Sequence, residues 1–258
     1  MRWLTRLLAV VGALALVSAL TYATVQGWRR KNVGRVQRGY EVAYRNGCFS
    51  CHGPGGIKGM ANPGHADEEV PPWSGGLMTM YSQNEGEIRE WILDGLPKRI
   101  REDPEQMKLR ARAAIDMPPW RGLLSDRELD DLVAYVKAVG DFELPQDEKA
   151  DAGRKISERL GCFNCHGPQG RGASPNARAF KGYIPSWDGS DFPELARDDA
   201  EIREWILDGV SRRLAGSKAA RFFLERQPIK MPAYRGHVKD EEVDRILDYI
   251  HWVRQHPY

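Results

Sequence analysis

The sequence Cys48-Phe49-Ser50-Cys51-His52 places two thiols three positions apart and an imidazole directly after the second thiol. This Cys-x-x-Cys-His pattern is the one through which c-type haem is attached: each thiol adds across a haem vinyl group, and the histidine ligates the iron. Two other interpretations share the Cys-x-x-Cys spacing, namely half of a zinc site and a redox-active dithiol. One copy of the motif leaves both of them open.

A second copy, Cys162-Phe163-Asn164-Cys165-His166, begins 114 positions after the first. The same offset relates the segments 87–95 and 201–209, which both read EIREWILDG, and no gap is needed anywhere. A duplicated unit of about a hundred residues is a plausible domain, so we expect two copies of one fold, each with its own core. All four cysteines of the chain are used by the two motifs, which leaves no further cysteine for zinc and none for a disulfide.

Hydrophobic spacing predicts a set of helices in each unit, and the cap residues Asn84, Asp198 and Ser125, each followed three positions later by a glutamate, predict where three of them begin. We expect an anchor and basic collar over residues 1–32, a first domain over 33–143 and a second domain over 144–258, with a hinge near 140–150. Gly39 and Gly153 occupy matching positions in the first predicted helix of the two units. Glycine costs about 1 kcal/mol relative to alanine inside a helix, so a packing reason for both is expected.

A methionine stands at the same place in both units. Met117 lies 65 positions after His52, and Met231 lies 65 positions after His166. Four other methionines of the first unit have no counterpart in the second: Met60, Met78, Met80 and Met107. The duplicated pair is therefore the predicted source of a thioether ligand opposite the histidine.

The N-terminus carries an apolar run of 19 residues, 7–25, with Arg2 and Arg6 before it and three basic residues at 29–31 after it. This run is long enough to span a bilayer. A cleaved signal peptide is the alternative, although the apolar core of a signal peptide is usually shorter, about 7 to 15 residues. Counting Lys and Arg alone would place the following domains in the cytoplasm, because more of them follow the run than precede it.

The formal charge of +2 hides a division along the chain. Residues 1–38 hold seven of the 38 Lys and Arg and no Asp or Glu, so the remainder carries 31 basic and 36 acidic side chains, a net charge of −5. A mildly acidic pair of domains argues against a nucleic-acid binder and favours a partner with a basic docking face.

Together these features resemble the class I cytochrome c family: a helix with a glycine, the Cys-x-x-Cys-His motif, a loop, a middle helix, a Met-Pro step, and a last helix with an aromatic residue at Tyr135 or Tyr249. The resemblance covers residues 36–143 and 150–258. It implies an all-α fold in which an N-terminal transmembrane helix precedes two tandem class I cytochrome c domains. The chain departs from the smallest family members in its long basic stretches, 98–112 and 212–230, which we expect to contact propionates, to guide a partner or, most simply, to form solvated helix faces.

The resemblance also implies two covalently bound haem c groups. The covalent attachment residues are Cys48, Cys51, Cys162 and Cys165, and the iron ligands are His52, Met117, His166 and Met231. Trp73 and Trp187 are expected to close the haem pockets or to bond a propionate, with plain core packing as the alternative.

Ligation by His and Met fills both axial positions and leaves no open site for a substrate, which favours electron transfer over catalysis. The leading interpretation is a membrane-anchored dihaem cytochrome c of a bacterial respiratory or photosynthetic chain. It would pass single electrons between a quinol-side or dehydrogenase donor and a terminal acceptor, either alone or as a subunit whose N-terminal helix packs against integral-membrane partners. Haem attachment in such proteins is completed outside the cytoplasm, so the haem domains are predicted on the periplasmic or outer side of the inner membrane, against the charge count.

An enzyme is the competing interpretation, such as a dihaem peroxidase or a thiosulfate-type dehydrogenase with one open or exchangeable axial site. Four spare histidines are candidates for such a ligand exchange: His65, His237, His251 and His256. None of them is duplicated, and most are expected on the surface.

Overall fold

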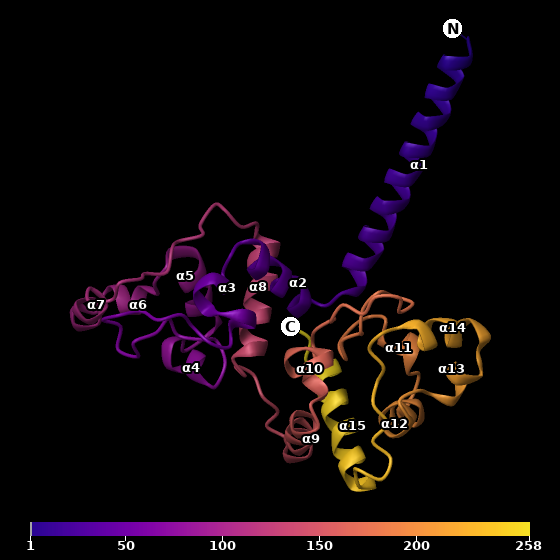
Figure 1. Cartoon of the computed structure of the whole chain (residues 1–258). Coiled ribbons are helices and arrows are strands. Elements are labelled where there is room, and N and C mark those ends of the chain that lie inside the picture. The colour runs from indigo at the N-terminus through magenta and orange to yellow at the C-terminus, as the bar shows by residue number, and fades with distance from the viewer. Residues whose placement is uncertain (1) are drawn as a thin grey trace.

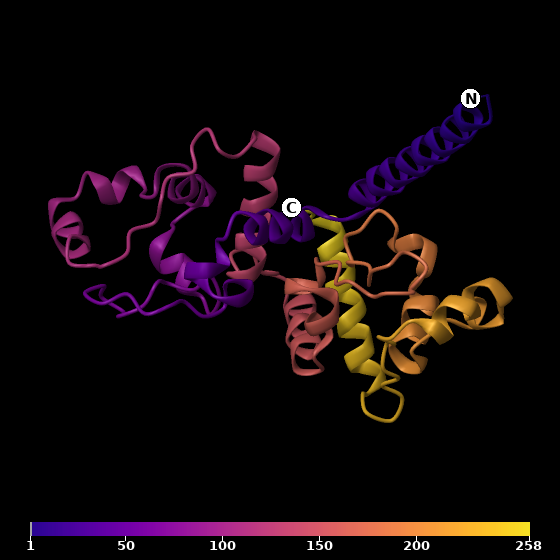
Figure 2. The ribbon, with the colours of Figure 1, turned by 45° about the horizontal axis from the view of Figure 1, so that its top comes forward.

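The computed structural model describes residues 2–258, which form one long N-terminal helix and two globular lobes. The lobes lie side by side, and helix α1 (Arg2–Asn32) projects away from both of them (Figures 1 and 2). Within residues 2–258 the only β-type pairing consists of two isolated bridges, Ala61 with Glu69 and Pro175 with Tyr183. The prediction of an all-α protein is therefore confirmed.

The two lobes repeat one order of helices. The first lobe contains α2 (Arg35–Arg45), α3 (Phe49–His52), η1 (Pro54–Gly56), α4 (Leu77–Tyr81), α5 (Glu85–Asp94), α6 (Lys98–Arg101), α7 (Pro104–Arg110) and α8 (Asp126–Val139). The second contains α9 (Glu148–Arg159), α10 (Cys162–His166), η2 (Pro168–Gly170), α11 (Phe192–Leu195), α12 (Asp199–Asp208), α13 (Arg212–Gly216), α14 (Lys218–Arg226) and α15 (Asp240–Gln255). The basic stretches thus form pairs of short helices, α6 with α7 and α13 with α14.

Helix α1 has the length and composition of a membrane span. Its segment Arg6–Thr24 has a mean hydropathy of 2.0, and none of that segment is buried against the rest of the protein. The hydroxyls of Thr21 and Thr24 each donate to the backbone carbonyl four residues earlier at 2.8 Å, so both polar groups are satisfied within the helix. A signal sequence near the N-terminus would share this length and composition.

The first and last helices of each lobe cross in close contact at a glycine. A Cβ atom on Gly39 of α2 would lie 1.9 Å from the carbonyl oxygen of Asp131 in α8. A Cβ on Gly153 of α9 would lie 1.8 Å from the carbonyl oxygen of Arg245 in α15. The packing reason expected for these glycines is thus a backbone approach that no side chain allows.

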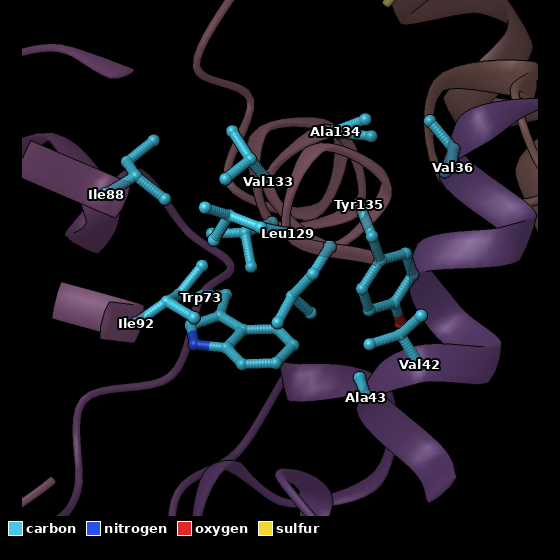
Figure 3. Close-up of a cluster of buried hydrophobic side chains, with 13 residues drawn as sticks. Val36, Val42, Ala43, Trp73, Ile88, Ile92, Leu129, Val133, Ala134 and Tyr135 are labelled. Atoms are coloured by element: carbon cyan, nitrogen blue, oxygen red, sulfur yellow. The ribbon is translucent and has the colours of Figure 1, made fainter. Parts of the chain in front are cut away.

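The core of the first lobe lies between the crossed helices, the middle helix and one indole (Figure 3). Val36 from α2, Ile88 from α5 and Leu132 from α8 belong to one buried cluster with Trp73, which is 6% exposed. The hydroxyl of Tyr135 in α8 donates to the carbonyl of Gly55 at 3.0 Å, which ties the last helix to the loop after the Cys-x-x-Cys-His motif. In the second lobe the hydroxyl of Tyr249 donates to the carbonyl of Gln169 at 3.1 Å in the same way.

The helix caps expected from the sequence are present. Asn84 accepts from the amide of Glu87 at 3.1 Å, and Asp198 accepts from the amide of Glu201 at 2.9 Å. The middle helices then end at Gly95 and Gly209, both in the left-handed conformation that favours glycine. Ser125 forms a capping box with Glu128 at the start of α8. These local hydrogen bonds fix where each middle helix starts and stops.

The beginning of the first lobe touches the second lobe. Val33 is buried together with Ala173 and Tyr183. The side-chain carbonyl of Gln37 in α2 accepts from the backbone amide of Ala173 at 3.1 Å. Because Gln37 belongs to the first helix of one lobe and Ala173 to a loop of the other, the two lobes share an interface as well as a linker.

Tyr258 lies at the centre of the same interface, where the C-terminal end of the chain lies between the lobes (Figures 1 and 2). Its ring packs against the first lobe's core and lies 4.8 Å from the ammonium of Lys137. The guanidinium of Arg171, a fully buried residue of the second lobe, lies 4.3 Å from the ring of Tyr258. Gln169 completes the contact: it accepts from the Tyr258 hydroxyl at 3.2 Å and donates to Asp141 at 3.1 Å. One aromatic ring is thus held between cations from both lobes.

We expect Gly39→Ala and Gly153→Ala to lower the free energy of unfolding by about 2 kcal/mol or more, since the added methyl group meets a backbone oxygen that cannot rotate away. Urea unfolding followed by far-ultraviolet circular dichroism measures the effect. Gly216→Ala is the control, because its Cβ would meet nothing within 4 Å. Equal stability of Gly153→Ala and Gly216→Ala would contradict the close crossing.

We expect Tyr258→Ala to loosen the contact between the lobes without unfolding either of them, because it removes the ring between Lys137 and Arg171. Small-angle X-ray scattering should show a larger radius of gyration, and limited proteolysis should cut faster within residues 140–147. Tyr44→Ala is the matched control, since Tyr44 is 71% exposed on the first lobe. An unchanged scattering profile for Tyr258→Ala would show that Tyr258 does not hold the lobes together.

Candidate functional site

Each lobe contains an apolar cavity that is lined in part by its Cys-x-x-Cys-His motif. The first cavity has a volume of about 150 Å³ and the second of about 430 Å³. The predicted residues come together around them: Cys48, Cys51, His52, Trp73 and Met117 line the first, and Cys162, Cys165, His166, Trp187 and Met231 line the second. In each lobe the histidine and the methionine therefore line the same cavity, although 65 positions separate them in the chain.

The motif forms a short helix, α3 or α10, which sets its side chains on one face. Residues three and four positions apart are neighbours on a helix, so Cys48, Cys51 and His52 project to the same side. Burial raises the pKa of Cys48 to about 11, and that of Cys162 to about 11 as well. Reactive dithiols have the opposite property, a lowered thiol pKa, so the environment does not support the redox-dithiol interpretation.

The histidine of each motif is oriented by a proline carbonyl. Nδ1 of His52 lies 3.0 Å from the carbonyl oxygen of Pro71, and Nδ1 of His166 lies 3.0 Å from that of Pro185. A carbonyl only accepts, so Nδ1 carries the proton and donates it, and Nε2 keeps its lone pair for a metal. Burial lowers the pKa of His52, which keeps the imidazole neutral and able to ligate.

The two tryptophans form one wall of each cavity. The ring centroid of Trp73 lies 4.7 Å from that of His52, and the ring centroid of Trp187 lies 5.4 Å from that of His166. A Cβ on Gly56 would come within 2.2 Å of the Trp73 ring, so a glycine is needed where the loop passes the indole (Figure 3 shows the ring). Each indole therefore lies both in the wall of its cavity and in the hydrophobic core of its lobe.

The segment that carries the methionine runs along the middle helix. The amide of Trp120 donates to the carbonyl of Ile92 in α5 at 3.1 Å, and a Cβ on Gly95 would lie 2.4 Å from the carbonyl oxygen of Met117. In the second lobe the amide of Tyr234 donates to the carbonyl of Ile206 at 3.1 Å. The C-terminal glycine of the middle helix thus allows the methionine segment to approach the helix closely.

An asparagine that the sequence analysis missed braces the methionine segment. The side-chain amide of Asn62 donates to the carbonyl of Ile115 at 3.0 Å and accepts from the amide of Ile115 at 2.9 Å. Asn176 makes the same pair of bonds with Ile229, at 2.8 and 3.1 Å. Each asparagine therefore holds the backbone two residues before the methionine. The offset of 114 between Asn62 and Asn176 was the signal in the sequence that could have identified these residues. It could not have identified what each asparagine binds, because the bonded isoleucine lies 53 positions further along the chain.

The two cavities differ in the rest of their lining. His65, Tyr81 and Arg110 line the first cavity, whereas the positions that correspond to them in the second unit hold Ala179, Leu195 and Leu224. Phe180 and Phe223 line the second cavity, with ring centroids 5.1 Å apart. The duplication thus preserves the motif and the methionine while the walls diverge.

Among the spare histidines, His65 differs from the expected surface position. Its side chain is 10% exposed and lines the first cavity. His251 pairs with Asp199 at 2.9 Å on the surface, His256 is bonded to the carbonyl of Trp252 at 2.8 Å, and His237 is exposed. Only His65 therefore has a position from which it bears on the chemistry of a cavity.

The residues present fit a covalently attached haem. Within residues 2–258 no group of three or more His, Cys, Asp and Glu side chains is placed to hold a metal ion. Two thiols on one helix face, an imidazole with a free Nε2, a thioether and apolar walls match the attachment and axial ligation of haem c.

Comparison with family models matches each lobe separately. Residues 150–254 match a family described as cytochrome c, and residues 34–136 match a family described as cytochrome c oxidase, cbb3-type, subunit III. No curated protein and no solved structure matches the chain at a significant level. The two family matches cover the two lobes and leave α1 outside both.

We expect Asn62→Ala to lower the free energy of unfolding by about 1 to 3 kcal/mol, because it leaves a backbone amide and a carbonyl of Ile115 without partners. Amide hydrogen exchange in residues 113–119 should accelerate, and Asn176→Ala should do the same in residues 227–233. Asn46→Ala removes one local bond, to Val42 at 2.8 Å, and is the control. Unchanged exchange in 113–119 would show that Asn62 does not brace this segment.

Proposed function

Both lobes are domains of the cytochrome c family, so the chain is an electron-transfer haem protein, and we propose that it is a membrane-anchored dihaem cytochrome c. It passes single electrons between a quinol-side or dehydrogenase donor and a terminal acceptor of a bacterial respiratory or photosynthetic chain. The observation that carries this proposal is the duplicated cavity, in which a Cys-x-x-Cys-His helix and a methionine 65 residues later meet.

We assign the haem-binding roles residue by residue. Cys48 and Cys51 form the thioether bonds in the first domain, and Cys162 and Cys165 form them in the second. His52 and Met117 would hold the iron in the first domain, and His166 and Met231 would hold it in the second. When bound, each haem supplies an iron that cycles between the ferric and ferrous states, and a Met ligand raises its reduction potential.

Three pairs of residues in the chain favour electron transfer at these sites. The carbonyls of Pro71 and Pro185 hold the imidazoles in one tautomer and orientation. Asn62 and Asn176 fix the backbone before each methionine, so that the sulfur stays on the cavity side. Trp73 and Trp187 exclude water from one wall, which lowers the local dielectric and keeps the surroundings rigid during electron transfer.

The interface between the domains supports transfer within the chain. Tyr258, Arg171 and Gln37 join the two domains, so the two sites keep one separation while electrons enter one domain and leave from the other. A rigid pair of sites avoids the search that two domains on a flexible linker would need.

We propose that α1 anchors the domains at the bacterial inner membrane, with the domains on the periplasmic or outer side. The apolar, unburied segment Arg6–Thr24 supports a membrane span. The match of residues 34–136 to a subunit of an oxidase supports a role within a membrane complex, where α1 would pack against integral-membrane subunits. The net charge of −5 outside residues 1–38 supports redox partners with basic docking faces and no role in nucleic-acid binding.

A second candidate function is a redox enzyme of the peroxidase or thiosulfate-dehydrogenase type, with an exchangeable axial site in the first domain. The observation in its favour is His65, the spare imidazole that lines the first cavity and has Ala179 as its counterpart. Only a lost or replaced Met117 ligand would make that haem accessible.

For the electron carrier, we expect the reduced full-length protein to show no spectral response to carbon monoxide, since both axial positions of each haem are filled. Met117→Ala and Met231→Ala should each make half of the haem responsive and abolish half of the methionine-to-ferric-iron charge-transfer band. Met107→Ala, which changes a methionine without a counterpart, is the control. A response of half the haem in the unmutated protein would favour the enzyme.

A further inference from the structure

One basic side chain of the stretch 98–112 enters the first cavity. Arg110, at the end of α7, is the one Lys or Arg among the described residues that line this cavity. Its side chain is 18% exposed, whereas its neighbours Lys108 and Arg112 are exposed. The simplest explanation of the basic stretch, a solvated helix face, therefore does not apply to Arg110.

Among the described residues, the guanidinium of Arg110 has one ion pair, and that pair is long. Its nearest carboxylate is that of Asp116, at 3.6 Å, and the Asp116 side chain is 76% exposed. The Trp91 ring lies 4.9 Å from the guanidinium carbon and holds it by a cation–π contact. Burial lowers the pKa of Arg110, as expected for a guanidinium withdrawn from water. An arginine has five N–H donors, and this one has its donors available at the edge of an apolar cavity.

The basic residues that line the second cavity differ from Arg110 in their position and in their partners. The position that corresponds to Arg110 holds Leu224. Lys181 lines the second cavity from another loop, and its ammonium is already paired with Asp191 at 2.9 Å and Glu194 at 2.8 Å. A charge neutralised by two carboxylates has little left for a bound anion. Lys230 also lines the second cavity, but it is an exposed residue, so water and salt screen its charge. The two cavities therefore differ in the cations that line them.

We propose that Arg110 is an anion-binding residue of the first cavity and binds a propionate carboxylate of the first haem, a role without a counterpart in the second domain. This inference rests on the proposed haem binding. A guanidinium matches a carboxylate with two parallel hydrogen bonds, and it is the side chain best suited to this purpose in a partly buried site.

A positive charge beside one haem has a consequence for the direction of electron flow. Reduction places an additional negative charge on the iron centre, which a nearby cation stabilises, so Arg110 raises the reduction potential of the first haem relative to a site without it. Because Leu224 stands at the matching position, this contribution is absent from the second haem. Arg110 thus biases the electron toward the first domain.

The test is a spectroscopic redox titration of the full-length holoprotein and its Arg110→Leu, Arg110→Lys and Arg112→Leu variants. In Arg110→Leu we expect the redox equilibrium constant of one haem to fall by about tenfold, which is about 59 mV for one electron, and that of the other haem to stay unchanged. The shifted component should be the one that Met117→Ala makes responsive to carbon monoxide. Arg110→Lys keeps the charge and should restore most of the potential, and Arg112→Leu should change neither haem.

Unchanged potentials in Arg110→Leu, or an equal shift of both haems, would overturn the proposal. If Arg110→Leu loses haem, Arg110→Gln replaces it as the neutral variant: a fall of about tenfold in the redox equilibrium constant of one haem supports the proposal, and unchanged potentials refute it. The pyridine haemochrome assay of haem content distinguishes a failure of the Arg110 proposal from a failure of the proposed function. An unmutated chain without two covalent haems would refute the proposed function itself.

Discussion

The close crossing of the first and last helices is the constraint on which each domain depends. At Gly39 and Gly153 the two backbones approach so nearly that a hydrogen atom is the largest group that fits. This contact fixes α8 and α15, whose tyrosine hydroxyls then hold the loop that follows the Cys-x-x-Cys-His motif. The motif, its proline carbonyl and its tryptophan wall therefore take their positions from one helix crossing.

The two domains share the residues proposed to bind iron, and they differ in the residues around those sites. The braces of Asn62 and Asn176 and the carbonyls of Pro71 and Pro185 recur with nearly the same distances. The walls do not recur, since Arg110 faces a cavity where the other domain has Leu224. Conserved ligation with divergent charge is a physical means of giving two similar sites different reduction potentials, which a carrier with an entry and an exit requires.

The interface turns two domains into one electron-transfer unit. Arg171 and Tyr258 have Ile57 and Leu144 as their counterparts in the first unit, so this contact arose outside the duplicated pattern. Tyr258 lies between a lysine of one domain and an arginine of the other, and its ring excludes water from both. The domains thus meet through residues that the ligand sites do not use, which leaves the two sites free to be tuned separately.

The sequence alone determined the repeat, the attachment motif, the histidine and methionine pair, the crossing glycines and the caps at Asn84, Asp198 and Ser125. These follow from local rules: spacing on a helix, side-chain bonds three residues away, and a constant offset between two copies. Only the tertiary structure decided that the carbonyl of Pro71 accepts the hydrogen bond of His52, that Asn62 braces Ile115, that Arg110 enters a cavity, and that Tyr258 joins the domains. Each of these depends on where a loop or chain end returns after many residues, and the physical reason is that such long-range contacts leave no period in the sequence.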